Sequence, residues 1–214
     1  MRFLHWPYIA CVTIGAVAAG SLTHHLMKPG DVRHEITVVN QEVLYRSGQL
    51  TADELANEIH ARGIKTVINL GSRTDWDTDV CQREGVELID MPVGDVWCIC
   101  GVSAPGYDVV PEAPYDLAPF WEAIDDPERR PVLIHCWGGV HRTGVLSGIY
   151  RIQRQGWSAE DALAEMRLFG FNNRKDKFAE VAEYMHELEE EQEVIQRMAR
   201  QPTSKSQIGE ATNR

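Results

Sequence analysis

The chain has 214 residues, of which 43% are hydrophobic, a composition that suits one globular domain with short appendages. Its formal net charge of −11 argues against a nucleic-acid-binding surface. The five cysteines are odd in number and lack the spacing of paired CxxC motifs, which argues against a disulfide framework and a structural zinc site.

The N-terminal segment, residues 1–30, is expected to be separate from the globular domain. Residues 6–22 (WPYIACVTIGAVAAGSL) are uncharged and largely apolar, and their length is close to the minimum for a membrane span. We expect an uncleaved N-terminal hydrophobic helix that makes the protein membrane-associated, on a side that the few flanking charges do not determine. The alternative is a signal peptide, because residues 16–18 (AVA) fit a cleavage site that would leave a secreted or periplasmic protein.

Strands and helices alternate from residue 36 onward. Strands are predicted at 36–40, 42–47, 65–70, 86–91 and 131–135, each a short and mostly apolar run. Helices are predicted at 52–62, 77–84, 115–124, 142–155, 159–169 and about 174–200. Thr51 and Ser158 are candidate helix N-caps, and Gly63, Gly85 and Gly156 are candidate stops. The alternation predicts an α/β fold with a mainly parallel central sheet flanked by helices.

One loop carries residues with the chemistry of a nucleophile. In HCWGGVHRTG (135–144), Cys136 follows the last predicted strand and Arg142 opens the next predicted helix. A cysteine attacks as the thiolate, which the positive end of a helix, inward amides and a fixed cation all favour. Gly138 and Gly139 supply the dihedral freedom that a tight curl of amides needs.

A ring of amides closed by a guanidinium is suited to a tetrahedral dianion such as phosphate. Arg142 can bind two phosphate oxygens bidentately while the Cys136 sulfur faces phosphorus. The other phosphate-binding positions are then the residues between them, Trp137, Gly138, Gly139, Val140 and His141. Thr143 is a candidate donor to the cysteine sulfur, and His135 is interpreted as a buried structural brace. No metal and no cofactor is required by this chemistry.

HCWGGVHRTG resembles the His-Cys-x5-Arg-Ser/Thr loop of the cysteine-dependent protein tyrosine phosphatase superfamily. LYRSGQL (44–50) followed by TVINLGS (66–72) is similar to the atypical dual-specificity phosphatases of bacteria, plants and fungi. The resemblance implies that fold, and hydrolysis of phosphomonoesters through a phosphocysteine intermediate without metal. Residues 31–200 are accordingly assigned to the catalytic domain, and 201–214 to a disordered polar tail.

The family also implies an aspartate general acid in a mobile loop after the preceding strand. Asp95, directly after the strand at 86–91, is the favoured candidate. Asp108 is the alternative, because the long proline- and glycine-rich segment at 92–114 carries an apparent insert. Either aspartate could instead cap a local turn.

The loop favours some substrates over others. Relatives that act on inositol phosphates often carry lysines between the cysteine and the arginine, whereas this chain has Trp137, Gly138, Gly139, Val140 and His141. Each missing charged hydrogen bond to an extra phosphate would cost about 1–3 kcal/mol. The leading expectation is therefore a protein tyrosine or dual-specificity phosphatase, whose partner is a phosphorylated protein or a small phosphate ester. An inositol (pyro)phosphate or phosphoinositide phosphatase and an inactive phosphate-binding scaffold are the alternatives. A disulfide between Cys136 and another cysteine (Cys81, Cys98 or Cys100) is left open.

Overall fold

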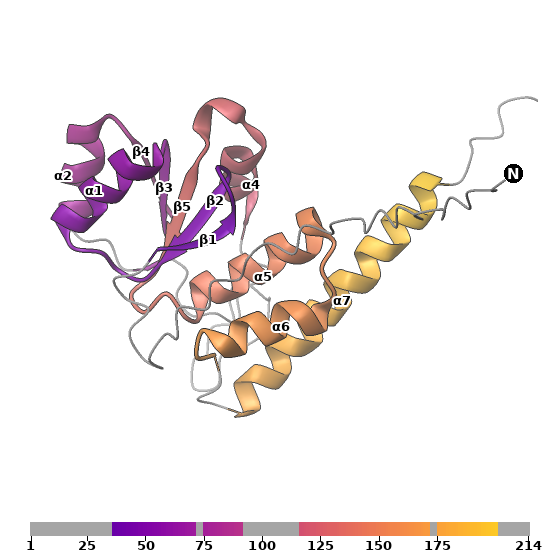
Figure 1. Cartoon of the computed structure of the whole chain (residues 1–214). Helices are drawn as coiled ribbons and strands as arrows, with labels where there is room; N and C mark the ends of the chain where they lie inside the picture. The colour runs from indigo at the N-terminus through magenta and orange to yellow at the C-terminus, as the bar shows by residue number, and fades with distance from the viewer. Residues whose placement is uncertain (1–35, 72–74, 92–115, 172–174, 201–214) are drawn as a thin grey trace, which may run out of the picture.

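The computed structural model describes residues 36–71, 75–91, 116–171 and 175–200. Its strands are β1 (Thr37–Asn40), β2 (Leu44–Ser47), β3 (Thr66–Asn69), β4 (Glu87–Asp90) and β5 (Val132–His135). Its helices are α1 (Ala52–Arg62), α2 (Asp75–Glu84), α4 (Ala118–Asp125), the short 3-10 helix η1 (Pro127–Arg129), α5 (Arg142–Gln155), α6 (Ala159–Leu168) and α7 (Lys175–Arg200). Figure 1 shows these elements arranged around one central sheet.

The described strands form a five-stranded sheet in the order β1-β2-β5-β3-β4. β1 is antiparallel to β2, and the other three pairings are parallel. The predicted α/β fold with a mainly parallel central sheet is therefore confirmed. β5 lies between β2 and β3, so the loop that follows it emerges beside the carboxyl ends of both neighbours.

Helices cover both faces of the sheet because successive residues of each buried strand point to opposite sides. On one face, Tyr45, Val67 and Leu133 pack against α1 and α2. On the other face, the alternate positions of the same strands pack against α4, α5, α6 and α7, with Ile68 and Ile134 among them. Figure 1 shows α1 and α2 on one side of the sheet and α4 to α7 on the other.

Short-range signals set most helix ends. The Thr51 side chain accepts a hydrogen bond from Glu54 N, and the Glu54 carboxylate accepts one from Thr51 N, which completes a capping box at α1. Gly63 and Gly156 end α1 and α5 with φ of 63° and 67°. α4 begins at Ala118, later than the predicted start at 115, because the Asp116 carboxylate accepts a hydrogen bond from Ala118 N.

The prediction of a membrane-associated protein is corrected. In the ranges that the structure describes, no helix has the length and apolar character needed to cross a membrane. The segment on which the prediction depended, residues 1–30, lies outside those ranges, and the predicted hydrophobic helix there has no support from the structure. Length and apolar composition alone predicted a span, and neither reports whether a helix forms.

Candidate active site

The loop from Cys136 to His141 connects the carboxyl end of β5 to the first turn of α5. Cys136 directly follows the last residue of β5 and is 3% exposed, and Arg142 is the first residue of α5. The loop therefore begins at the end of a central buried strand and ends at a helix N-terminus, where free backbone N–H groups and the helix dipole favour an anion.

Three carbonyl groups of this loop region each accept a hydrogen bond from a neighbouring segment, one from the β3 side and two from the β2 side. His135 O accepts from Leu70 N (2.8 Å), Trp137 O from Gln49 N (3.2 Å) and Gly139 O from Arg46 Nη2 (2.7 Å). In a trans peptide the C=O and the following N–H point in opposite directions. The N–H groups of the three following residues, Cys136, Gly138 and Val140, are therefore directed to the opposite side of the chain.

A backbone contact makes glycine necessary at one position of the loop. Gly139 has φ of 66°, in the left-handed region that other residues rarely adopt. A Cβ at this position would lie 2.6 Å from Gly48 N and 2.9 Å from Ser47 C. Gly138 differs, because a Cβ there would meet nothing within 4 Å. The backbone that follows β2 thus packs directly on the loop at Gly139.

The Arg142 side chain is held by the segment that follows β3. Its Nη1 donates to Leu70 O at 2.8 Å. Gly71 lies close by, since a Cβ there would be 3.5 Å from Trp137 N and 3.7 Å from Arg142 Nη1. The Gly71 N–H in turn donates to the Asn69 side chain at 2.8 Å. The NLG sequence at 69–71 therefore orients the arginine that closes the loop.

Arg46 lies buried beneath the loop on the face covered by α5 and α6. It is 2% exposed, its guanidinium is 4.1 Å from the centre of the Phe169 ring, and it donates to Gly139 O. Burial lowers the pKa of Arg46 from 12.5 to about 10, and the charges of Glu165 and Cys136 oppose that shift. A guanidinium with this pKa is charged at neutral pH, so the loop has a fixed cation behind it.

The remaining predicted residues of the loop are distributed between core and surface. Thr143 is fully buried, and its hydroxyl has no hydrogen-bond partner among the described residues, which leaves it able to donate. Trp137 is 62% exposed, so it is not a core tryptophan. Val140 packs against the core cluster, and exposed His141 contacts the Phe171 ring edge to face with centroids 5.0 Å apart.

His135 lies on the opposite face of β5 from the core beneath α5, in a row with Ser47 and Asn69 on the adjacent strands. It is 2% exposed, and its Nε2 is 4.0 Å from the Asp77 carboxylate. Burial lowers the pKa of His135, with the negative charge of Asp77 acting in the opposite direction. His135 is thus buried as predicted, but neither of its ring nitrogens has a hydrogen-bond partner among the described residues, so its role as a structural brace stays a prediction.

Both candidate general acids, Asp95 and Asp108, lie outside the described residues, as do Cys98 and Cys100. Cys81 packs with α1 and α2 on one face of the sheet, whereas Cys136 belongs to the core cluster on the other. Within the described ranges, no group of three or more His, Cys, Asp or Glu side chains is arranged to hold a metal ion.

Sequence reasoning missed four residues that support the loop: Arg46, Gln49, Asn69 and Asp77. The first three belong to the YRSGQ and NLG segments that carried the family resemblance, so their motif was visible although their roles were not. Asp77 had no signal, because it is one of three aspartates in DWDTD and only the fold selects it for burial.

Comparison with known proteins decides the family. Residues 30–186, well over half of the chain, match the family described as a DSP-PTPase phosphatase fused to an NAD+ kinase. The chain belongs to this family. The predicted membership of the cysteine-dependent phosphatase superfamily is thereby confirmed.

Two characterised relatives match shorter stretches. The chain is 48% identical over 46 residues to the dual specificity protein phosphatase TpbA of Pseudomonas aeruginosa, a stretch that covers 22% of this chain and 21% of TpbA. It is 44% identical over 50 residues to the inositol diphosphatase SIW14 of Saccharomyces cerevisiae, covering 23% of this chain and 17% of SIW14. The chain therefore matches about a fifth of the length of these relatives.

A solved structure supports the fold. The core catalytic domain of the PP-IP phosphatase SIW14 from S. cerevisiae aligns with a TM-score of 0.53 and 22% identity. The alignment covers 79% of this chain and 95% of that chain. The central sheet and its flanking helices are thus shared with a phosphatase domain.

Proposed function

We propose that this protein hydrolyses phosphate monoesters through a phosphocysteine intermediate. The Cys136 sulfur attacks phosphorus, forming an S–P bond while the bond from phosphorus to the leaving oxygen breaks and an aspartate donates its proton to that oxygen. Water then attacks phosphorus while the aspartate takes up one of its protons, the S–P bond breaks, and inorganic phosphate leaves. Asp95 is the favoured proton donor and Asp108 the alternative. Thr143 donates its hydroxyl to the sulfur as it becomes the leaving group.

The observation that carries this proposal is the set of loop carbonyls held from outside. Gln49 N and Arg46 bind Trp137 O and Gly139 O from the β2 side, so the N–H groups of Gly138 and Val140 face away from that side and are available to an anion. Such preorganised donors stabilise the charge that develops on the equatorial oxygens without rearrangement during the reaction. Arg142, held by Leu70 O, supplies the bidentate contact.

The same loop favours aryl phosphates, phosphotyrosine among them, as substrates. Trp137 is exposed directly beside Cys136, where its ring is available to a flat apolar leaving group. From 137 to 141, only His141 can supply a cationic side chain to a second phosphate. The second candidate, an inositol (pyro)phosphate phosphatase, is favoured by the similarity to SIW14.

The experiment is turnover of p-nitrophenyl phosphate by the full chain beside Cys136→Ser, Asp95→Asn and Asp108→Asn. Cys136→Ser should abolish turnover and still bind inorganic phosphate, since the amides and Arg142 remain. Of the two aspartate variants, the one that lacks the true general acid should lose most of its turnover rate on substrates with poor leaving groups. Unchanged turnover in Cys136→Ser would overturn the mechanism. The turnover of a phosphotyrosine peptide and of an inositol pyrophosphate, measured under the same conditions, separates the two substrate classes.

A further inference from the structure

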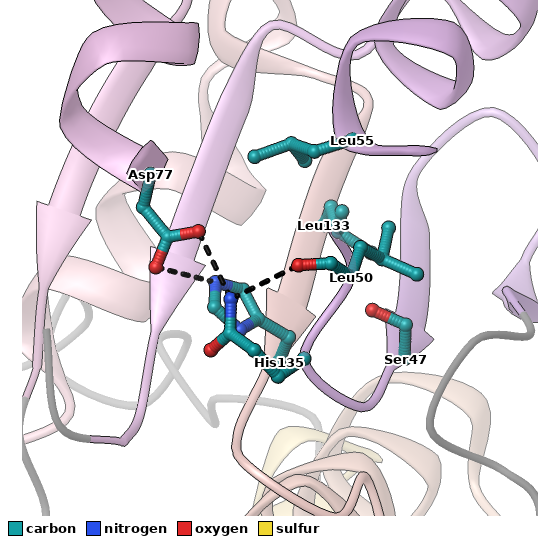
Figure 2. Close-up of a pocket in the computed structure, with 7 residues that line it drawn as sticks. Ser47, Leu50, Leu55, Asp77, Leu133 and His135 are labelled. Atoms are coloured by element: carbon teal, nitrogen blue, oxygen red, sulfur yellow. Dashed lines mark hydrogen bonds and ion pairs between the residues drawn. The ribbon is translucent and has the colours of Figure 1, made fainter. Parts of the chain in front are cut away.

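Asp77 is a buried carboxylate on the face of the sheet opposite Arg46. It projects from α2 and is 0% exposed, whereas Asp79 on the same helix is exposed. Figure 2 shows its side chain directed toward His135 at the end of β5, beside Leu50 and Leu133. A carboxylate removed from water must be held by donors, so its partners indicate what it serves.

The partners of Asp77 come from three different segments of the chain. Gln49 Nε2, from the stretch after β2, donates to Oδ1 at 3.1 Å, and Asn69 Nδ2, from the end of β3, donates to Oδ2 at 3.3 Å. His135 Nε2, from the end of β5, lies 4.0 Å from Oδ2. Hydrogen bonds thus join Asp77 to the segment after β2 and to the end of β3, and His135 at the end of β5 lies beside it without a hydrogen bond.

Gln49 and Asn69 also bind the catalytic loop or its neighbours. The Gln49 backbone N–H donates to Trp137 O at 3.2 Å. The Asn69 side-chain oxygen accepts from Gly71 N at 2.8 Å, and Gly71 lies against both Trp137 N and the Arg142 guanidinium. Each of these residues therefore donates to Asp77 from its side-chain nitrogen and uses a second atom, the backbone nitrogen of Gln49 or the side-chain oxygen of Asn69, on the loop side.

His135 provides the third connection, because it is bonded covalently to Cys136. Ser47, Gln49 and Asp77 surround His135 together with three leucines (Leu50, Leu55 and Leu133), and these side chains leave no room for a water molecule between them. Side chains this closely packed move together rather than singly. A displacement of Asp77 is therefore transmitted to all three strand ends.

We propose that Asp77 is a positioning residue of the active site, which holds these strand ends in the arrangement that places Cys136 and Arg142 around one phosphate. The proposal deepens the proposed phosphatase function and rests on it. Asp77 touches no substrate and acts through Gln49, Asn69 and His135. A loop displaced by about 1 Å can lose roughly a hundredfold in rate, so a remote carboxylate can have a large effect.

The test compares Asp77→Asn and Asp77→Leu with the matched control Asp79→Asn, which removes an exposed carboxylate from the same helix. Turnover of p-nitrophenyl phosphate is measured for each at a temperature well below its melting transition. Binding of inorganic phosphate is measured for each in a Cys136→Ser background. We expect Asp79→Asn to leave both quantities within about twofold of the unsubstituted chain. We expect kcat/KM to fall about 10- to 100-fold in the Asp77 variants, more in Asp77→Leu than in Asp77→Asn, and phosphate affinity to fall with it.

A purely structural role would give a different pattern. The Asp77 variants would then have a lower melting temperature, but kcat/KM and phosphate affinity of the folded protein would stay within about twofold of those of Asp79→Asn. That result would overturn the proposal. If neither Asp77 variant folds, Gln49→Leu removes one connection alone and should show a smaller loss in both measurements. If the unsubstituted chain turns over neither an aryl phosphate nor an inositol pyrophosphate, the proposed function fails, and the phosphate-binding comparison still decides the role of Asp77.

Discussion

Arg46 donates from Nη2 to the carbonyl oxygen of Gly139 at 2.7 Å, which places a buried cation directly behind the catalytic loop. This single bond joins β2 to the loop after β5, and it faces the helices rather than the solvent. The cation is costly to bury, since removal from water lowers the pKa of Arg46 to about 10 and so disfavours the charged form. A group retained at such a cost is expected to serve the loop more than the overall stability.

Arg46→Met should therefore separate activity from stability. We expect the free energy of unfolding to change by less than about 2 kcal/mol, because the lost hydrogen bond is offset by relief of the buried charge. We expect kcat/KM for an aryl phosphate to fall about tenfold or more, because Gly139 O loses its donor and the loop loses its cation. Denaturant unfolding and steady-state kinetics check both. The control is Arg154→Met, which removes an exposed arginine of α5, and equal kinetics in the two variants would contradict the prediction.

Gly139→Ala and Gly138→Ala form a pair that differs in backbone constraint. At Gly139 the new Cβ would lie 2.6 Å from Gly48 N in a left-handed conformation, so the loop must move. At Gly138 the new Cβ has open space, and the amide is retained. We expect a loss in kcat/KM of about a hundredfold or more for Gly139→Ala and less than about tenfold for Gly138→Ala. Similar losses in both variants would show that the contact with Gly48 is unimportant.

Cys81 should be unreactive in the folded protein. Burial raises the pKa of its thiol from 9.0 to about 12, so the thiolate that reacts with alkylating agents is scarce at neutral pH. We expect iodoacetamide to modify Cys81 only after unfolding, as measured by peptide mass spectrometry with and without denaturant. Rapid modification of Cys81 in the native protein would contradict the burial of α2 against α1.

His135 should make the protein less stable in mild acid. Its pKa is lowered in the folded state by burial, so below about pH 6.5 the unfolded chain binds a proton that the folded protein does not. Its contribution to stability is present above that pH and is lost as the pH falls, by at most about 1.4 kcal/mol per pH unit. Denaturant unfolding at pH 7, 6 and 5 measures this dependence.

His135→Asn should flatten that pH dependence, whereas His186→Asn, at an exposed position on α7, should leave it unchanged. Identical slopes in the two variants would mean that other groups cause the acid sensitivity.

Local sequence determined the elements and the nucleophile of this protein. The Thr51 N-cap of α1, the glycine stops and the Cys136 to Arg142 spacing each depend on residues a few positions apart, so the sequence predicted them without the fold. The alternation of elements likewise predicted the mainly parallel sheet. The start of α4 was misplaced because one hydrogen bond, from Ala118 N to Asp116, decides it.

Tertiary structure alone decided what supports the loop. Ser47, Asn69 and His135 form one row because β5 pairs in register with both β2 and β3, although they are far apart in the chain. That register places Arg46 beneath Gly139 on one face and Asp77 beside His135 on the other. Burial of a charge depends on which surfaces meet, and that information is spread over the whole domain rather than held in any short motif.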